Sequence, residues 1–326
     1  MRGARGQNPE KALRTCTVID HLGFSLTQLR YFVVSAEVGN ISEAAEKLSA
    51  SQSTVSSAVM RLERQLGVQL LLRHHARGVT LTPSGRHLLR EARALLGQAR
   101  SLKARGDALA GDTAGPLDVG FLSSLAPFLL PPVHRMTRER YAALQLNVLE
   151  ASAGQLLTFL QDGRCEVVVT YDFLAGEARF RPLVALPMHA LLADDDPMSA
   201  AGSLGLDELA ARPLVTLDDP AVLRHREAVF ADRGVRMPRV ITTTSLETLR
   251  GLVAAGAGFG LMYQRAAHAS TLDGGTVCAV EIAGEVPSAS LGVAMMPDLT
   301  MSSRGRAFLQ VLRSVVSLGC GVKSIA

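Results

Sequence analysis

The spacing of apolar residues changes along the chain and divides it into two parts. Between residues 25 and 110, apolar positions recur at the three-and-four spacing of amphipathic helices. From Leu117 onward, short apolar runs such as LDVGF, LQLNVLE and CEVVVTY have strand character and are separated by helical segments. The pattern predicts a helical first part, followed by an α/β part built from βαβ units around a parallel sheet.

Three short helices and a hairpin are predicted in the first part. Ser25 opens a capping box ahead of the first helix, Asn40 begins the second in the same way, and Ser51 begins the third. The run VQLLLRHHARGVTLT then alternates about a turn, which indicates a β-hairpin. Together these elements predict a winged helix-turn-helix domain over residues 25–82, with the helix-turn-helix itself at residues 41–60.

A longer helix is predicted to follow the hairpin. Thr82 and Pro83 form a strong helix start, because threonine suits the N-cap and proline the first helical position. Small or apolar residues then recur at alternating spacings of four and three, as in a coiled-coil seam. We therefore favour a dimerisation helix at residues 83–110 over a helix packed only on its own domain. The seam consists of Leu88, Ala92, Leu95, Ala99 and Leu102.

The second part carries further runs that predict strands and helices in alternation. Strands are expected at residues 189–193, 214–217, 240–243, 260–263, 277–282 and 291–295. Helices are expected at residues 125–140, 154–161, 223–234, 245–255 and 304–318.

Composition fits a globular protein, with 48% hydrophobic and 20% charged residues. No run reaches the roughly 18 uncharged apolar residues that a membrane span needs. Residues 1–24 lack the apolar core of a secretory signal and have no periodicity, so we interpret them as a flexible tail or the product of an upstream start codon. A cytoplasmic protein without a membrane partner is expected.

The net charge of +4 is unevenly distributed. Residues 25–110 carry twelve Lys and Arg against six Asp and Glu, whereas residues 111–326 carry eighteen against twenty-two. A basic module joined to a slightly acidic domain is typical of a nucleic-acid-binding protein with a second task.

Signatures of catalysis or of a metal site are weak in the sequence. The cysteines Cys16, Cys165, Cys278 and Cys320 are far apart and predict neither a zinc site nor a disulfide framework. The run of aspartates at residues 194–196 precedes a proline and is interpreted as a solvated loop. No GxSxG, P-loop, HExxH or strand-linked GxGxxG motif occurs. We therefore predict no catalytic residues, no cofactor and no metal.

The third predicted helix has the chemistry of a DNA reader. Val55, Val59 and Leu62 share one face and are expected to hold the helix on its scaffold. Short polar side chains occupy the other faces, where they can approach base edges and phosphates in a major groove. Arginines on this helix and on the wing are expected to contact phosphates or the minor groove. The predicted DNA-binding residues are Gln52, Ser53, Thr54, Ser56, Ser57, Arg61, Arg64, Arg73 and Arg77.

The segment LRYFVVSAEVGNISEAAEKLSASQSTVSSAVMRLERQLGVQLLLRHHARGVTLTPSG resembles the DNA-binding region of LysR-type transcriptional regulators along its whole length. More loosely, LVAAGAGFGLMYQ resembles a glycine-rich strand entry in the effector domain of that family. The resemblance implies homodimers or homotetramers joined by linker helices. It also implies a C-terminal domain at residues 115–318 resembling periplasmic binding proteins. We expect lobe I at about residues 115–171 and 289–318, and lobe II at about residues 172–288.

Two departures from the family pattern bear on recognition. Ser53 to Ser56 stand where the family often has Pro or Ala followed by Ala-Leu-Ser, so the preferred bases are expected to differ. The wing carries Leu71 and Leu72 where a Phe and an acidic residue are usual. His74 and His75 are neighbours, but no Cys or carboxylate follows at metal-ligand spacing, so we interpret them as wing residues.

Hydroxyl residues recur where strands of the second part end. Ligands of open α/β sheets bind at these carboxyl ends, beside helix N-termini. For any single residue, a simple capping role is an equally good explanation. Asp218 and Asp219 form an acidic rim, which leaves the charge of the ligand open. The predicted effector-binding residues are Ser123, Ser124, Thr170, Tyr171, Thr243, Thr244 and Ser245.

Together these features predict a transcriptional regulator that binds double-stranded promoter DNA as a homo-oligomer and responds to a small-molecule effector. Whether RNA polymerase is a further partner is left open. One alternative is a small-molecule receptor module without promoter regulation, against which the basic helix argues. A second is an enzyme fused to a DNA-binding module, with Asp172 or Asp218 as the residues to test.

Overall fold

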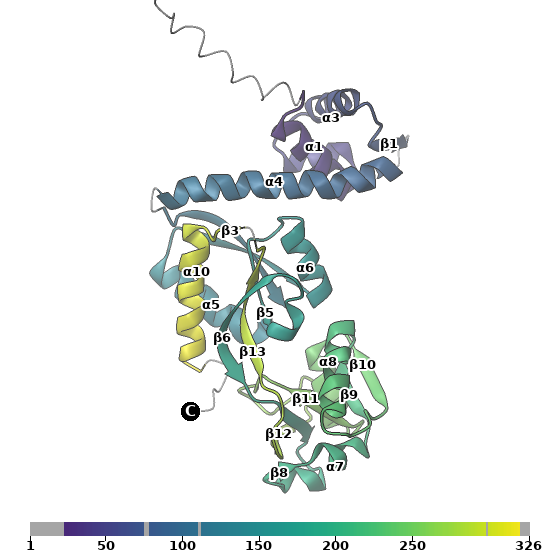
Figure 1. The fold of residues 1–326 in the computed structure, drawn as a ribbon, viewed down its shortest axis with the longest axis vertical. Helices are drawn as coiled ribbons and strands as arrows, with labels where there is room; N and C mark the ends of the chain where they lie inside the picture. The colour runs from purple at the N-terminus through teal and green to yellow at the C-terminus, as the bar shows by residue number, and fades with distance from the viewer. Residues whose placement is uncertain (1–22, 75–77, 110–111, 298, 320–326) are drawn as a thin grey trace, which may run out of the picture. The chain divides into compact units, whose positions relative to one another are not determined.

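The computed structural model describes residues 23–74, 78–109, 112–297 and 299–319. These residues form two compact units, whose boundary falls inside one long helix after Leu96. Most of the predicted tail therefore lies outside the described residues, and so do Cys16, His75, Arg77 and Cys320. Figure 1 shows the course of the chain.

The first unit is the winged helix-turn-helix that the sequence predicts. Three helices pack around a common core that includes Phe32, Val55 and Leu62, all fully buried. A two-stranded antiparallel wing follows, with Leu71 paired to Leu81 at its base. Its elements are α1 (Leu26–Val38), α2 (Ile41–Lys47), α3 (Gln52–Leu66), β1 (Leu71–His74), β2 (Gly78–Leu81) and the part of α4 (Pro83–Leu109) up to Leu96.

Local capping explains where these helices begin and end. The Ser25 side chain accepts from the Gln28 N–H at 3.2 Å, and Gln28 Oε1 accepts from the Ser25 N–H at 2.7 Å, so the predicted capping box forms. The side chain of Asn40 caps α2. Gly39 ends α1 with a φ of 70°, a left-handed conformation that glycine adopts without a steric penalty.

The coiled-coil seam predicted on α4 is divided between two environments. Leu89 and Ala92 are buried in the core of the first unit, so this part of the helix packs on its own domain. The seam prediction is thus wrong for Ala92. In contrast, Leu95 and Leu102 are 38% and 73% exposed. An apolar contact surface is left only on the later part of the predicted seam.

Gly85 in the first turn of α4 lies against the backbone of the wing. A Cβ added there would stand 2.1 Å from the Leu70 carbonyl oxygen. Gly85→Ala is therefore expected to destabilise the first unit by about 1–3 kcal/mol, as overpacking usually does. The measurement is faster hydrogen exchange of the amides in α3 and β1 in the full chain. Gly154→Ala is the control, because no atom lies within 4 Å of its added Cβ.

The second unit holds two mixed sheets. We call the part around the five-stranded sheet, of order β4-β3-β5-β13-β6, lobe I. The part around the six-stranded sheet, of order β10-β9-β11-β7-β12-β8, is lobe II. Lobe I contains β3 (Gly115–Leu122), β4 (Leu144–Ala151), β5 (Val167–Tyr171), β6 (Arg179–Leu186) and β13 (Ala289–Met295). Lobe II contains β7 (His189–Ala193), β8 (Ser203–Leu204), β9 (Leu214–Leu217), β10 (Val240–Thr243), β11 (Phe259–Met262) and β12 (Val277–Ile282).

Two predictions about these sheets need correction. A purely parallel sheet was expected, but β13 runs antiparallel to β5 and β6, and β7 runs antiparallel to β11 and β12. The crossover between lobes was placed at residues 171/172. Because β6 pairs with β13 along its length, the chain leaves the lobe I sheet only after Leu186. The strand at Arg179–Leu186 was not predicted at all.

Helices cover these sheets, and all except α7, which was not predicted, lie within a few residues of the predicted bounds. In lobe I, α5 and α10 lie side by side and α6 packs on β3 and β5 (Figure 1). In lobe II, α9 packs on β7 and β9, while α8 contacts β9. The helices are α5 (Ala126–Arg140), α6 (Ala153–Gln161), α7 (Leu206–Ala210), α8 (Pro220–Ala231), α9 (Leu246–Ala254) and α10 (Ser303–Ser317). None of the helices in the described residues is long and apolar enough to span a membrane.

Candidate functional site

The first candidate site is the exposed surface of α3. Val55, Val59 and Leu62 are fully buried and fix the helix to its unit, as their spacing predicts. The opposite faces carry the predicted polar side chains. Ser56 is partly buried, whereas Gln52, Ser53, Thr54, Ser57, Arg61, Arg64 and the wing residue Arg73 are exposed.

The start of α3 separates engaged side chains from free ones. Ser51 Oγ accepts from the Thr54 N–H at 3.1 Å and lies 2.8 Å from Ser53 Oγ and 2.7 Å from Thr54 Oγ1. The hydroxyls of Ser53 and Thr54 are therefore engaged in local capping. The side chains of Gln52 and Ser57 make no hydrogen bond to another described group, so both can turn toward a ligand.

A hydrogen bond between two side chains joins the wing to the third helix. Arg73 Nη1 in β1 donates to Ser56 Oγ in α3 at 2.9 Å. The guanidinium and the hydroxyl thus lie on one continuous exposed surface, although they are 17 positions apart in the sequence. His74 Nε2 lies 2.8 Å from Thr80 Oγ1 across the hairpin, which supports its interpretation as a wing residue.

Glu63 is a structural member of this surface that the sequence reasoning missed. Its Oε1 accepts from the backbone N–H groups of Leu70 and Leu71 at 2.8 and 3.0 Å. These bonds tie the end of α3 to the first strand of the wing. Hydrogen bonds to a charged acceptor are stronger than neutral ones, so Glu63 fixes the wing relative to the helix. Its interior position in α3 gave no signal of this role.

The second candidate site is a cleft in the second unit, formed by two adjoining cavities. The outer cavity holds about 1080 Å³ and the inner one about 400 Å³ of empty space, open solvent included. They adjoin, because Leu122, Ser124 and Val222 line both. Polar residues of the outer cavity are Ser123, Ser124, Glu150, Ser152, Gln155, Asp218, Asp219 and Thr244, and those of the inner one are Ser124, Tyr171, Thr216, Arg226, Tyr263 and Gln264.

The cleft lies at the carboxyl ends of strands from both lobes, as the strand-end rule predicts. Of the seven effector residues predicted, four line it: Ser123, Ser124, Tyr171 and Thr244. The other three line neither cavity. Ser245 Oγ accepts from the Thr248 N–H at 3.3 Å and caps α9, and Thr243 Oγ1 accepts from the Ser245 N–H. Thr170 is buried and its hydroxyl has no hydrogen-bond partner.

Two hydrogen bonds cross between the lobes at the cleft. Asp219 Oδ1 caps α8, while its Oδ2 accepts from the Ala153 N–H at the start of α6 at 3.2 Å. Gln264 Nε2 donates to the Ser124 carbonyl oxygen at 3.1 Å. The carboxylate of Asp219 is thus neutralised by backbone donors of two helices. Of the acidic rim that the sequence predicted, Asp218 is solvent-exposed, and Glu150 adds a second exposed carboxylate to the outer cavity.

Arg226 is the cleft residue that the sequence reasoning missed. It is 6% exposed, and its Nη2 donates to the Leu261 carbonyl oxygen at 2.8 Å. Nη1 lies 3.8 Å from Met188 Sδ, and Nε has no partner. No described carboxylate pairs with this guanidinium within 4.0 Å. Desolvation by burial lowers the pKa of Arg226, while Tyr263 and Tyr171 raise it.

Aromatic rings surround this guanidinium. Its Cζ lies 5.3 Å from the ring centroid of Tyr263. Tyr171 packs on Tyr263 with centroids 5.5 Å apart, and its hydroxyl is buried without a partner. Burial raises the pKa of Tyr171 far above its usual value and that of Tyr263 to about 12, so both phenols stay protonated. His225 Nε2 lies 2.5 Å from Tyr263 Oη, and burial lowers its pKa to about 4.

A signal for Arg226 was nevertheless present in the sequence. Val222, Val229 and Phe230 lie on the buried face of α8, and Arg226 occupies the same stripe at helical spacing. A charged residue within an apolar stripe is rarely buried without a partner.

Comparison with known families and proteins adds to this geometry. Residues 26–86 match the bacterial regulatory helix-turn-helix family of the lysR type, and residues 110–317 match the LysR substrate binding domain. The dual regulator OxyR of Escherichia coli K12 is 30% identical over 292 residues, which cover 89% of this chain and 95% of that protein. A hydrogen peroxide-inducible genes activator of Pectobacterium carotovorum is 32% identical over 240 residues, 73% of this chain and 79% of its own.

Solved structures agree with these sequence matches. A full-length OxyR variant from Pseudomonas aeruginosa superposes with a TM-score of 0.71 at 27% identity, covering 90% of this chain and 98% of that one. Both domains are therefore matched by sequence and by fold, and the alternative of a receptor module without DNA binding is not favoured. The chain belongs to the LysR family of DNA-binding transcriptional regulators, with an N-terminal helix-turn-helix domain and a C-terminal effector-binding domain.

Proposed function

We propose that the effector of this regulator is a small organic anion held in the cleft by Arg226. The observation that carries the proposal is the buried guanidinium of Arg226, which no described carboxylate pairs with. Burying an isolated charge is costly, and a protein compensates it with a partner of opposite charge. A carboxylate is the natural partner, because its two oxygens match the fork of a guanidinium.

The neighbours of Arg226 complete an anion-binding set. Tyr171 offers a protonated hydroxyl without a partner, and Ser124 and Thr216 add hydroxyls on the same cavity. Leu122, Leu174 and Leu249 line the rest of this narrow cavity, so the body of the ligand would extend into the adjoining outer cavity. A few placed polar groups in an otherwise apolar pocket are typical of small-molecule sites.

The ligand would act by changing how the lobes close. Ser124 and Tyr171 belong to lobe I, whereas Arg226 and Thr216 belong to lobe II, so one molecule would bridge both. A ligand shifts a conformational equilibrium only by binding one state more tightly. Bridging contacts supply that difference, because they exist only when the lobes are close together. The resulting change would reach the DNA through the geometry of a homodimer or homotetramer in the cytoplasm.

The proposed DNA surface has two functions. We assign sequence reading to Gln52, Ser56 and Ser57 on α3, with Ser53 and Thr54 placing the helix start against phosphate. Arg61, Arg64 and Arg73, together with Arg77, would hold phosphates without reading sequence. Contact with RNA polymerase is a further part of the proposal.

The names of the relatives suggest peroxide as a second candidate effector. Of the described cysteines, Cys165 is buried in the core of lobe I, and Cys278 lies on β12. Burial raises the pKa of the Cys278 thiol, with Asp194 adding to it, which disfavours the thiolate that reacts with peroxide. Neither side chain lines the cleft. This supports a bound anion over thiol oxidation.

The test is DNA binding by the full chain, with and without candidate effectors. Fluorescence anisotropy on the intergenic DNA upstream of its own gene should show binding that weakens steeply with salt. Small carboxylates, offered beside their uncharged amides, should shift the affinity or the melting temperature, and the amides should not. If hydrogen peroxide changes DNA binding equally in the parent and in the double variant Cys165→Ser/Cys278→Ser, these two thiols are excluded as its sites of reaction. The proposal would be contradicted if peroxide changes the DNA affinity and none of the carboxylates does.

The exposed part of the seam on α4 carries the proposal of a homo-oligomer. Leu95→Arg and Leu102→Arg would each place a charge on that apolar surface, so we expect a lower mass by light scattering and weaker operator binding. Arg90→Lys, a charge-conserving change at an exposed position of the same helix, should keep the parent mass. An unchanged oligomer in both leucine variants would exclude this surface as the interface.

A further inference from the structure

A second hollow in the effector domain lies beside the cleft but is lined by other residues. It contains about 1220 Å³ of empty space, open solvent included. Its walls come from β7, β12 and the segment at residues 264–269, together with Phe128 of α5. It shares Met262 and Gln264 with the inner cavity of the cleft. We call it the β7/β12 pocket.

Nitrogen-bearing side chains without partners line this pocket. His189 is 2% exposed, and its Nδ1 makes no hydrogen bond. Arg265 also lines the pocket, and no described carboxylate pairs with it. His268 adds a third such side chain, while Asp194 is the one acidic residue among the lining residues that the structure describes. Arg250 and Arg265 are permanently charged, so the described lining carries two positive groups against the one negative group of Asp194.

The His189 imidazole is neutral in the unliganded protein. Burial, followed by the charges of Arg265 and Arg226, lowers the pKa of His189 to about 3. A neutral ring can donate one hydrogen bond to an anion without bringing in a second charge. A buried polar atom without a partner is costly, so a ligand that supplies the partner gains that energy.

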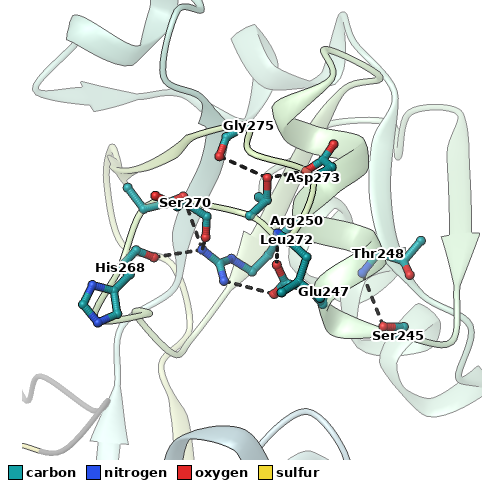
Figure 2. A network of polar contacts seen from close by, with 11 residues as sticks. Ser245, Glu247, Thr248, Arg250, His268, Ser270, Leu272, Asp273 and Gly275 are labelled. Atoms are coloured by element: carbon teal, nitrogen blue, oxygen red, sulfur yellow. Dashed lines mark hydrogen bonds and ion pairs between the residues drawn. The ribbon is translucent and has the colours of Figure 1, made fainter.

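The wall that carries Arg265 and His268 is held firmly in place. Figure 2 shows Arg250 of α9 reaching into the segment: its Nη2 donates to the carbonyl oxygens of His268 at 2.8 Å and of Ser270 at 3.0 Å. Its Nη1 pairs with Glu247 at 3.1 Å, and Glu247 Oε1 accepts from the Leu272 N–H at 3.1 Å. These bonds fix the segment before any ligand arrives, which lowers the entropic cost of binding.

We propose that the β7/β12 pocket is a second ligand site, which takes a small monocarboxylate with a short apolar body. The carboxylate would lie between Arg265 and the Nδ1 of His189. The apolar body would pack on Phe128, Val277 and Ala279, which line the remaining wall. This site is separate from the cleft and does not depend on Arg226 holding an effector.

The position of the pocket gives its ligand a regulatory role. Gln264 lines the pocket and also donates the hydrogen bond to Ser124 that links the two lobes. A ligand beside Gln264 would change the stability of that link, and thereby the affinity of the cleft. By linkage, a cleft ligand would change the affinity of the pocket by the same factor.

The test locates a heavy-atom probe in the full chain. Crystals soaked with 6-bromohexanoate are expected to show an anomalous bromine peak beside Phe128 and Val277, and 6-bromohexan-1-ol at the same concentration should give none. Titration calorimetry in solution should show carboxylate binding to the pocket weakened at least tenfold by Arg265→Gln. In Arg226→Met, which removes the proposed anchor of the cleft, the pocket peak should persist.

The outcomes separate this proposal from that for the cleft. The β7/β12 site would be overturned by a bromine peak in the cleft alone or by the absence of any peak. It would also be overturned by equal occupancy of the pocket by the alcohol. Unchanged affinity in Arg265→Gln would overturn it as well. Loss of the pocket peak in Arg226→Met would show that the two sites are one. Arg265 is only half-buried, so Arg265→Gln is expected to fold, and an unchanged melting temperature of the unliganded variant verifies this.

Discussion

Gln52→Ala is expected to weaken binding to the specific operator by about 5- to 150-fold, the range for loss of one bidentate base contact. Gln52 is exposed at the first position of α3, and no neighbouring group in the described residues engages its amide. An amide of this kind can pair with N6 and N7 of adenine in the major groove. Binding to unrelated DNA should stay unchanged, because that binding depends on phosphate contacts.

Arg73→Ala is expected to give the complementary result. Its guanidinium lies on the wing and would contact phosphate, so all sequences should weaken about equally and the salt slope should fall by about one. Since Arg73 donates to Ser56, Ser56→Ala is expected to change sequence preference and to loosen this arginine as well. A double-mutant cycle on Ser56 and Arg73 measures that coupling.

The measurement is a titration of labelled operator and of a shuffled duplex at several salt concentrations. Gln65→Ala is the matched control, because Gln65 is an exposed glutamine near the other end of the same helix. It should bind both duplexes as the parent does. If Gln52→Ala and Ser56→Ala retain the operator preference of the parent, then α3 does not read the operator sequence.

The sequence predicted the first unit well because its signals are local. Caps at Ser25, Asn40 and Ser51, and the stripe of Val55, Val59 and Leu62, depend on residues a few positions apart. The wing is predicted from the alternation of apolar and polar residues in VQLLLRHHARGVTLT, which is an equally local signal. Contacts at longer range were missed even here, since nothing in the spacing linked Glu63 to the backbone of the wing.

The second unit was harder because its sheets depend on distant pairings. Arg179–Leu186 reads poorly as a strand, with Pro182 and two arginines in it, yet β13 pairs with it from more than a hundred positions away. The prediction of the effector-binding residues was limited by strand geometry. Side chains alternate between the faces of a strand, so neighbours such as Thr170 and Tyr171 cannot both face the cleft. The sequence alone did not show whether Thr170 or Tyr171 faces the cleft.

Arg226→Met is expected to remove the response to small carboxylates that bind in the cleft, measured in an Arg265→Gln background that lacks the proposed β7/β12 site. Loss of a buried, hydrogen-bonded charge partner costs about 2–5 kcal/mol, or roughly 30- to 4000-fold in affinity. The melting temperature of the unliganded protein is not expected to fall. Methionine keeps much of the volume and removes a desolvated charge, which offsets the lost hydrogen bond to Leu261.

This pair of results distinguishes a ligand anchor from a structural arginine. A structural Arg226 would lower the melting temperature when replaced, whereas a ligand anchor costs stability until its anion arrives. Thermal shift with and without carboxylate measures both quantities. Arg224→Met is the control, since Arg224 is exposed on the same helix and should leave both unchanged. A full carboxylate shift in Arg226→Met would refute the anchor, because nothing else buried in the inner cavity carries a permanent positive charge among the residues described.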